Sequence, residues 1–297
     1  STNASLFSEN NSSKVNTFSL GYDQDYITYK NELHHARRVS KWIGTTHKEK
    51  ILSQNDLLNF LPRMIWLQDE PIADPVCVPL FYLSKLAREN GMTVCQAGEG
   101  ADELFCGYPY WSRLLKLQTA NDFPFPKIFK EFGLKSLEIT GNSETKPYEW
   151  LKRGILGQKI FWGGAEGFTH EQKIKILSPR LQKMFRGYSS WEVVKPIYKE
   201  FINLSLQKDN LNWMSYLDLN LRLPELLLMR IDKMSMGVSL ECRVPFLDHK
   251  LVELAFSMPQ NIKVKNGRLK YILKKAVKDI IPEDIINRKK QGFDVPI

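Results

Sequence analysis

The sequence predicts an α/β fold, in which a parallel sheet carries helices on both faces and is followed by a largely helical C-terminal part. Two observations lead to this class. Before residue 111, short β-prone segments alternate with segments of helical periodicity, and this order is typical of a parallel sheet covered on both faces. After residue 205, leucine-rich segments recur at helical spacing, which indicates helices rather than further strands.

The first part of the chain supplies the expected strands and the helices between them. Strand composition is found in residues 17–21, 45–52 and 93–97. Between the first two strands, apolar residues at helical spacing predict a helix that Gly44 ends. Ser53 is a suitable N-cap for the next helix. A third helix is expected to begin with Asp74 as N-cap and Pro75 at its first position, and to end at Gly91.

The middle and the end of the chain are predicted to be mainly helical. Residues 112–205 are rich in Lys, Phe and Trp, and we expect helical and irregular structure there. A leucine-rich helix is expected over residues 213–236. The last clear helix carries an apolar stripe from Leu269 to Ile280, and Pro282 ends it.

These elements group into three expected domains. Residues 1–111 form an α/β nucleotide-binding core, residues 112–205 an insertion, and residues 206–297 a helical part that completes the site. Within the last part we interpret Arg243 and Asp248 as structural, because they belong to a domain-packing loop that leads into a helix capped by Asp248.

The composition describes an ordinary globular protein and excludes several classes. Of the 297 residues, 43% are hydrophobic and 25% charged. No apolar run is long enough to span a bilayer and no signal pattern opens the chain, so no membrane partner is expected. The four cysteines have no C-x-x-C spacing and the five histidines form no ligand pattern, which favours free thiols in the cytoplasm.

The net charge of +9 comes from 42 basic and 33 acidic residues. Such an excess suits a phosphate-bearing ligand, a nucleic acid or an acidic partner domain. The basic residues are spread along the chain, apart from residues 288–290, and a solvated basic surface accounts for most of them. An aromatic and basic pattern for nucleic-acid binding is missing, so no nucleic-acid partner is expected.

A glycine-rich turn with three carboxylates is the candidate site. It runs over residues 98–103, G-E-G-A-D-E, between a buried strand and a helix. Such turns expose backbone N–H groups to anions, and glycine allows a ligand to approach closely. Asp102 and Glu103 also fit the first turn of a helix for purely structural reasons. Glu99 precedes the helix, and no capping role explains it.

Three phrases together resemble the synthetase domain of glutamine-hydrolysing asparagine synthetases and their amidotransferase relatives. They are A-G-E-G-A-D-E-L-F-C-G-Y (97–108), R-I-D-K-M-S-M-G-V-S-L-E-C-R-V-P-F-L-D (230–248) and R-K-K-Q-G-F (288–293). T-F-S-L-G-Y near the start and D-E-P-I-A-D before the first phrase agree with them. The resemblance covers nearly the whole chain outside the middle segment, and the motifs are jointly specific.

The resemblance implies an ATP-pyrophosphatase fold, similar to that of adenine nucleotide alpha hydrolases. Such enzymes activate a carboxylic acid as an acyl-adenylate, release pyrophosphate and let ammonia attack the acyl carbon. By this resemblance, Glu99 handles the ammonia and Lys290 neutralises charge as pyrophosphate leaves. Nucleotide contacts are implied for Leu20, Gly98, Gly100 and Asp102, and Asp102 is also the implied Mg²⁺ ligand.

The chemistry favours these residue types independently. Ammonia must lose a proton as it attacks, so a positioned carboxylate helps. Departing pyrophosphate concentrates negative charge, which a lysine and a metal ion stabilise. By itself Lys290 would be interpreted as one more solvated lysine, and the phrase around it reverses that interpretation. Asp232 and Lys233 are explained by a local salt bridge as readily as by a role in the site.

The sequence departs from the family pattern at several points. A serine-glycine-glycine phosphate loop and a glutaminase domain are expected upstream of Ser1, so we expect this chain to be a fragment. Ala97 and Ala101 stand where the family often has serine. No arginine lies in residues 69–75, where some aspartate-specific members have one, and this leaves the acid substrate open.

The predicted function is therefore that of a synthetase domain of a glutamine-dependent amidotransferase. Its cofactors are ATP and Mg²⁺, and its ammonia comes from a glutaminase domain. Aspartate is the leading acid and a sugar uronic acid the alternative, and a homodimer is an expected assembly. A non-catalytic module of the same fold and a nucleic-acid-modifying ATP pyrophosphatase are the other classes.

Overall fold

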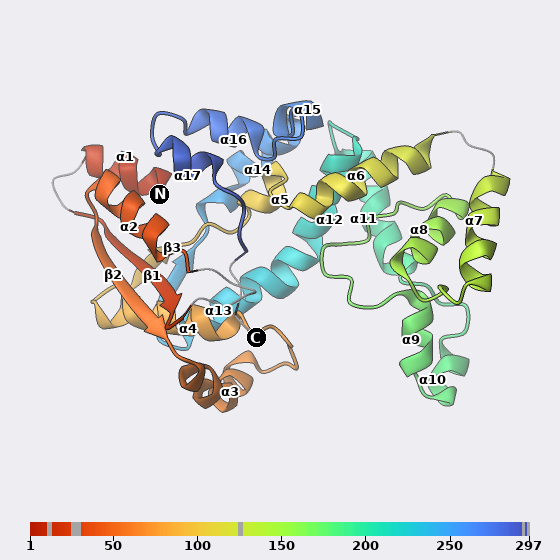
Figure 1. Ribbon diagram of the computed structural model, residues 1–297, viewed down its shortest axis with the longest axis horizontal. Helices are drawn as coiled ribbons and strands as arrows, with labels where there is room; N and C mark the ends of the chain where they lie inside the picture. Colours follow the sequence, from red (N-terminus) through yellow and green to blue (C-terminus); the bar gives the residue numbers. More distant parts are fainter. Residues whose placement is uncertain (11–13, 25–30, 124–126, 293–294, 296–297) are drawn as a thin grey trace. The chain divides into compact units, whose positions relative to one another are not determined.

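The computed structural model describes residues 1–10, 14–24, 31–123, 127–292 and 295. The chain divides into two compact units (Figure 1). Unit 1 consists of Ser1–Glu99, Leu226–Asp248 and Tyr271–Ile297, and unit 2 of Gly100–Glu225 and His249–Lys270. The three domains expected from the sequence remain a prediction about the organisation of the chain.

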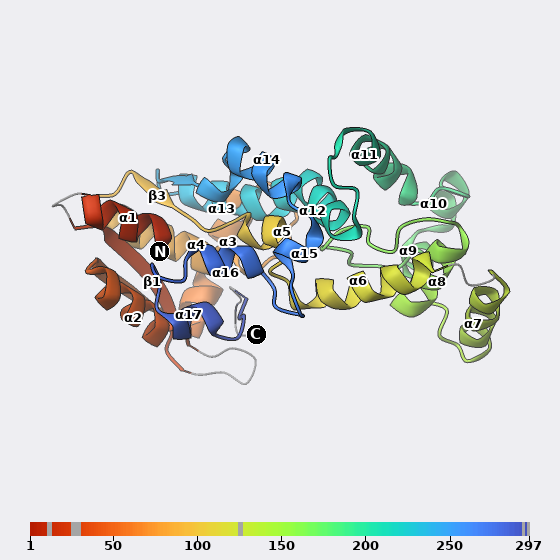
Figure 2. The same ribbon diagram turned by 90° about the horizontal axis from the view of Figure 1, so that it is seen from above.

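Two parallel strands form the first sheet of unit 1. β1 (Asn16–Tyr22) pairs with β2 (Thr46–Leu52), with Leu20 opposite Lys50. Helices α2 (Leu33–Ile43) and α4 (Cys77–Glu89) both contact the two strands. Figure 2 shows α4 on one side of β1 and α2 on the other. The predicted α/β class, with parallel strands and helices on both faces, is thus confirmed.

The second sheet of unit 1 joins segments that are far apart in the sequence. β3 (Val94–Gln96) pairs in parallel with β4 (Glu241–Arg243). The prediction that this strand is buried was wrong, because Val94 and Gln96 are exposed. The loop predicted around Arg243 and Asp248 contains the short strand β4, which the sequence analysis did not predict. The described strands therefore form two parallel pairs rather than one continuous sheet. A three-residue strand is too short to show a periodic pattern in the sequence.

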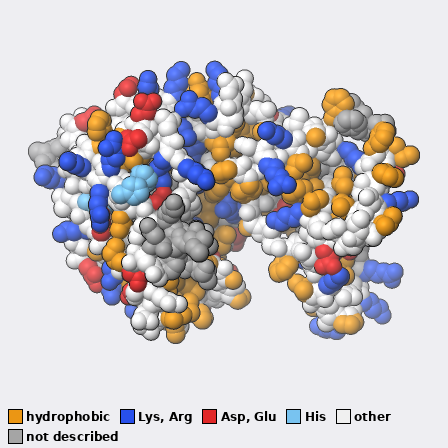
Figure 3. Space-filling view, in the orientation of Figure 1, with side chains coloured by type: hydrophobic (Ala, Val, Ile, Leu, Met, Phe, Trp, Pro, Cys, Tyr) orange, Lys and Arg blue, Asp and Glu red, His pale blue; other side chains and the backbone are white. Residues whose placement is uncertain are grey.

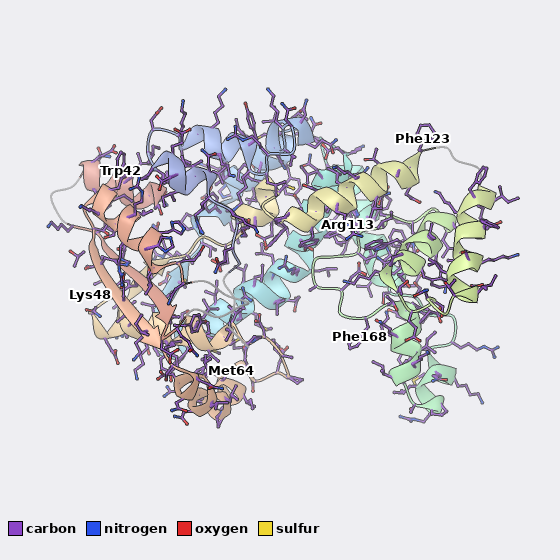
Figure 4. The ribbon with its side chains drawn as sticks, in the orientation of Figure 1. Trp42, Lys48, Met64, Arg113, Phe123 and Phe168 are labelled. Carbon is purple, nitrogen blue, oxygen red and sulfur yellow. The ribbon has the colours of Figure 1, made fainter. Side chains whose placement is uncertain are left out.

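The described part of unit 1 contains further helical elements. They are α1 (Thr2–Asn10), α3 (Gln54–Gln68), α13 (Met229–Met236), the 3₁₀ helix η2 (Pro245–Leu247), α16 (Tyr271–Ala276) and α17 (Glu283–Asn287). Trp42 of α2 (labelled in Figure 4) donates a hydrogen bond from Nε1 to the carbonyl of Ile280 at 3.2 Å. This bond ties the segment between the last two helices to α2.

The local helix signals in unit 1 were mostly correct. Gly44 ends α2 in the left-handed conformation at φ 79°, as glycine readily does. Ser53 caps α3 in a capping box with Asp56. The predicted start of α4 was wrong by a few residues: Val76 is its N-cap, and Asp74 accepts a bond from the Val76 N–H at 3.0 Å.

The secondary-structure elements of unit 2, in its described part, are all helices, and irregular segments connect them. Its helices are α5 (Ala101–Phe105), α6 (Pro109–Asp122), α7 (Lys127–Ile139), α8 (Lys146–Ile155), α9 (His170–Ile176), α10 (Pro179–Met184), α11 (Trp191–Leu204), α12 (Asn210–Asn220), α14 (His249–Ser257) and α15 (Gln260–Lys263). Its core is aromatic, with Trp111, Phe161, Phe201 and Trp213 all almost fully buried.

Two long predicted helices are interrupted. The helix expected over 213–236 is α12, a π-helix η1 (Leu223–Leu228) and α13. Pro224 lacks the N–H that a continuous α-helix needs, which explains the change of pattern. The last apolar stripe forms α16 only to Ala276, and the chain then tightens into turns such as Ile280 N–H to Val277 O. Among the described helices, none combines the length and the apolar character needed to cross a bilayer.

Candidate functional site

The turn after β3 begins from a fixed backbone. The N–H of Ala97 donates to the carbonyl of Arg243 at 2.8 Å, which extends the ladder between β3 and β4 by one bond. Gly98 follows and is exposed, and no described heavy atom lies within 4 Å of the position that a Cβ would take there. The backbone at Gly98 therefore leaves room for a ligand to approach.

Glu99 lies at the end of unit 1, next to the second strand pair. Its side chain is half-buried, and its negative charge acts on Cys242 of β4. Burial, together with this charge, raises the pKa of Cys242 to about 11. The thiol is therefore protonated at neutral pH, and it is no candidate nucleophile.

Gly100 turns the chain into unit 2. It is buried, has φ 89° and serves as the N-cap of α5, a conformation that non-glycine residues rarely adopt. Its carbonyl accepts the N–H of Leu104 at 2.9 Å. The helix that follows has only five residues and stops where Cys106 takes the left-handed conformation. The glycine-rich turn is thus set by the local sequence, as predicted.

Asp102 is held by a residue that the sequence did not suggest. Oδ1 of Asp102 lies 2.7 Å from Nζ of Lys270, and both side chains are about one-fifth exposed, at 21% and 22%. A Cβ at Gly107 would come within 1.5 Å of the same oxygen, so only glycine fits against this ion pair. The Asn266-Gly267 dipeptide predicts a turn before Lys270, but no local signal places Lys270 beside Asp102.

A buried polar cluster continues from α5 into the rest of unit 2. Tyr108 donates a hydrogen bond to Glu103, and Ser215 of α12 donates to the carbonyl of Glu103 at 2.6 Å. Burial raises the pKa of Tyr108 well above its usual value, and the nearby charge of Glu103 adds to this effect. The guanidinium of Arg222 lies 4.6 Å from the centre of the Tyr108 ring. These contacts fix the segment that carries Asp102.

Asp218 is a second residue of this cluster that sequence reasoning missed. It is fully buried and accepts a bond from the N–H of Gly164 at 2.6 Å. Burial raises its pKa to about 6, although the Gly164 bond and Arg222, 3.4 Å away, act in the opposite direction. The carboxyl group can therefore gain or lose a proton near neutral pH.

Leu20 and Lys290 belong to unit 1 and lie in different surroundings. Leu20 is 9% exposed and packs with Tyr22 and Leu52 in the core, so any nucleotide contact would come from its backbone. Lys290 is exposed on the segment after α17, and Arg288 anchors that segment through an ion pair with Glu32. Phe293, the last residue of its phrase, lies outside the described residues.

Asp74, in the segment over residues 69–75, forms an ion pair with an arginine that is distant in the sequence. Arg230 of α13 pairs with Asp74 at 2.5 Å, with both side chains 13% exposed. Lys233 lies 3.8 Å from Asp69, so the ion pair that the structure shows for Lys233 is with Asp69 rather than with its neighbour Asp232. A local salt bridge was one of the two interpretations that the sequence left open for this dipeptide.

The candidate residues are distributed over both units. Leu20, Gly98, Glu99 and Lys290 belong to unit 1, whereas Gly100 and Asp102 belong to unit 2. Within the units, the structure brings Glu99 near Cys242 and Asp102 against Lys270. The roles assigned to the six residues remain predictions.

The described residues contain no group of three or more His, Cys, Asp or Glu that could hold a metal ion. This excludes a cage of protein side chains in that part of the chain. Mg²⁺ usually keeps water and substrate phosphates as ligands and needs only one or two carboxylates. A single carboxylate in the first turn of α5, as Asp102 presents, fits that kind of binding.

Comparison with known proteins gives a consistent family. The asparagine synthase family model matches residues 1–297. Asparagine synthetase [glutamine-hydrolyzing] 1 of Bacillus subtilis is 33% identical over 286 residues, 95% of this chain and 43% of that protein. A putative asparagine synthetase [glutamine-hydrolyzing] of Mycobacterium tuberculosis H37Rv is 33% identical over 283 residues, 95% of this chain and 41% of that protein. The chain thus spans less than half the length of these relatives.

Proposed function

Because the chain belongs to the asparagine synthase family, we propose that it is the ATP-dependent synthetase part of a glutamine-dependent amidotransferase. In this reaction a carboxylate attacks the α-phosphorus of ATP, which gives an acyl-adenylate and releases pyrophosphate. Ammonia then attacks the acyl carbon, AMP leaves, and the amide forms after loss of a proton. The observation that carries the proposal is the open Gly98–Glu99 turn, which is fixed by β4, in a chain that the family model matches throughout.

Aspartate is the proposed acid and glutamine the proposed source of ammonia. The relatives that cover most of this chain are named glutamine-hydrolysing asparagine synthetases. We propose that glutamine is hydrolysed on a glutaminase domain, and that this chain uses the ammonia so released.

Glu99 is the proposed proton acceptor for ammonia. Glu99 follows β3, and the backbone just before it is hydrogen-bonded to β4. A carboxylate on a fixed backbone loses less conformational entropy when it acts on the ammonia. The attacking nitrogen becomes positively charged as the C–N bond forms, so a carboxylate both attracts it and removes its proton. Burial beside Cys242 shields the Glu99 side chain partly from water, which strengthens that attraction.

Lys290 and Asp102 are proposed to act at the phosphates. An exposed lysine on a segment without regular structure can follow the departing pyrophosphate and offset its charge. Asp102 would hold Mg²⁺ together with the phosphate oxygens of ATP, and bound Mg²⁺ would neutralise charge on these oxygens. Lys270 then acts as a positioning residue, because it holds the Asp102 carboxylate in one place.

A cytoplasmic location is part of the proposal. Cys77, Cys95, Cys106 and Cys242 are all free thiols in the structure. Free thiols suit a reducing compartment, in which ATP is also available. A homodimer remains a prediction without a structural test.

ATP–pyrophosphate exchange tests the proposed function. The full-length protein would be incubated with ATP, Mg²⁺ and labelled pyrophosphate, with aspartate or with one of several sugar uronic acids. Exchange that depends on aspartate and Mg²⁺ is expected. Exchange with a uronic acid alone would change the substrate class, and no exchange with any acid despite bound ATP would overturn the proposal.

Glu99→Gln separates the two half-reactions. The amide keeps the size of the side chain but accepts no proton at neutral pH, so amide formation should fall by at least tenfold while exchange is largely kept. Glu241→Gln is a matched control, because Glu241 is an exposed residue of β4. An equal loss of both half-reactions in Glu99→Gln would contradict the role in handling ammonia.

A further inference from the structure

Unit 2 carries a surface segment in which basic and apolar side chains alternate without any acid. Residues 172–191 contain five basic residues and no Asp or Glu. They cover most of α9, α10 and the start of α11. We call residues 173–188 the cationic tip. Figure 3 shows Lys and Arg side chains beside hydrophobic ones at this end of unit 2.

Three of the basic side chains are available for a partner. Arg180, Lys183 and Arg186 are exposed, and within the described part of the chain no ion pair holds them. The other two are engaged: Lys175 pairs with Glu144, and Lys173 donates a hydrogen bond to Ser190. The tip therefore presents three positive charges that nothing described in unit 2 neutralises.

Four apolar side chains of the tip are also well exposed. Ile176 and Met184 are 66% and 61% exposed, and Phe185 and Tyr188 are 48% and 49% exposed. The rings of Phe185 and Tyr188 lie 6.1 Å apart, so they form one contact surface. Exposed apolar side chains that cluster in this way commonly mark a binding surface.

Rigid local structure holds these side chains in place. Thr169 and Gln172 form a capping box at the start of α9, and Ser178 caps α10 with Pro179 at its first position. The helices have seven and six residues, which is too short for the repeated anchors of a helix that lies in a protein groove. Docking onto the surface of a lipid bilayer does not require a long helix.

We propose that the cationic tip docks unit 2 reversibly onto an anionic lipid surface. Apolar side chains enter the boundary between headgroups and acyl chains, while Lys and Arg stay among the anionic headgroups. Each basic side chain near such a surface strengthens binding about fivefold. A nucleic acid would use the charges but would leave Ile176 and Met184 exposed to water, so it fits the tip less well.

A lipid-docking surface was not expected from the sequence. The sequence predicts no membrane partner because it has no spanning segment, and no described helix is long and apolar enough to cross a bilayer. Docking at the surface of a bilayer needs no spanning helix. The inference does not depend on the proposed amidation.

Cosedimentation with lipid vesicles tests the proposal. The full chain would be mixed with vesicles of phosphatidylcholine alone and with vesicles that also contain phosphatidylserine. Binding is expected only to the anionic vesicles and should weaken as salt is raised. The triple variant Arg180→Glu, Lys183→Glu, Arg186→Glu should bind on the order of a hundredfold more weakly.

A control triple variant makes the same change in charge elsewhere on unit 2. Lys195→Glu, Lys199→Glu, Lys208→Glu alters exposed lysines outside the tip and should keep most of the binding. A double variant, Met184→Ser and Phe185→Ser, keeps the charge of the tip and should also weaken binding. Circular dichroism and thermal unfolding would show that each variant is folded.

Three results would overturn the proposal. The first is no binding of the folded full chain to anionic vesicles. The second is equal loss of binding in the tip triple variant and the control triple variant, because net charge alone would then explain it. The third is binding to soluble polyglutamate but not to vesicles, which would assign the tip to an acidic protein partner.

Discussion

Unit 2 buries five charged side chains, whereas the described buried polar side chains of unit 1 are all uncharged. The buried charges of unit 2 belong to Glu103, Glu149, Arg153, Asp218 and Lys263. The buried polar side chains in the described part of unit 1 are those of Ser5, Ser40, Gln68 and Ser235. Ion pairs of unit 1 such as Arg37–Glu49 and Arg38–Asp284 involve arginines about 60% exposed, at 62% and 59%.

The contrast shows what each unit uses to fix its side chains. In unit 2, Arg153 donates to Glu149, to Glu166 and to the carbonyl of Ile160, and its guanidinium lies 3.6 Å from the centre of the Trp162 ring. Buried charges are tolerated only with such partners. Unit 1 relies on strand ladders and apolar helix faces. Loss of a buried charge such as Arg153 should therefore cost more than loss of an exposed ion-pair partner such as Arg37 in unit 1.

The largest effect is expected for Arg153→Met. The change leaves two carboxylates without their partner, and we expect a loss of about 3–5 kcal/mol in the free energy of unfolding. Arg37→Met breaks the exposed pair with Glu49 and should cost at most about 1 kcal/mol. Denaturant unfolding of both variants measures the difference. Equal losses would break the contrast between the two units.

Asp218 should make the stability of the protein depend on pH. Its folded-state pKa of about 6 lies above the unfolded value of about 3.9. The native state therefore binds more protons between about pH 4 and pH 6, and the free energy of unfolding falls as pH rises through this window. The difference between the wild type and Asp218→Asn should fall by up to about 3 kcal/mol from acidic to neutral pH. Parallel pH profiles of the two proteins would show that Asp218 does not titrate in this range.

Gly107→Ala tests whether the tight packing of charge reaches the candidate site. The new Cβ would displace the carboxylate of Asp102, which it would approach to 1.5 Å. Pyrophosphate exchange should fall at least tenfold, which is about 1.4 kcal/mol. Gly167→Ala is the control, because no described heavy atom lies within 4 Å of its Cβ position. Unchanged exchange in Gly107→Ala would argue against a role for Asp102 at the phosphates.

The smallest effect is expected in unit 1 for Ser53→Ala. The Ser53 hydroxyl donates to Asp56 at 2.7 Å and accepts the N–H of Asp56 at 3.3 Å. Removing this cap should lower the free energy of unfolding by about 1 kcal/mol. Asn59→Ala, at an exposed position of the same helix, should have almost no effect. A loss of several kcal/mol for Ser53→Ala would mean that unit 1 depends on single polar contacts as much as unit 2 does.

Several features could be predicted because they depend on near neighbours in the chain. Gly44 and Ser53 mark the end and the start of helices, since capping involves only a few consecutive residues. The strands β1 and β2 are long enough for their composition to be seen. The candidate turn around Gly98 and Glu99 is also a local feature. It lies in the phrase over 97–108, and this phrase together with those over 230–248 and 288–293 indicates the family.

Only the tertiary structure decided which distant residues meet. The pairing of β3 with β4, the contact of Asp102 with Lys270 and the burial of Asp218 each join segments separated by many residues. No periodic pattern encodes such contacts, because they depend on how whole helices and strands pack. The cationic tip shows both contributions: its lack of acids is visible in the sequence, whereas the exposure of Ile176 and Met184 depends on what the fold leaves uncovered.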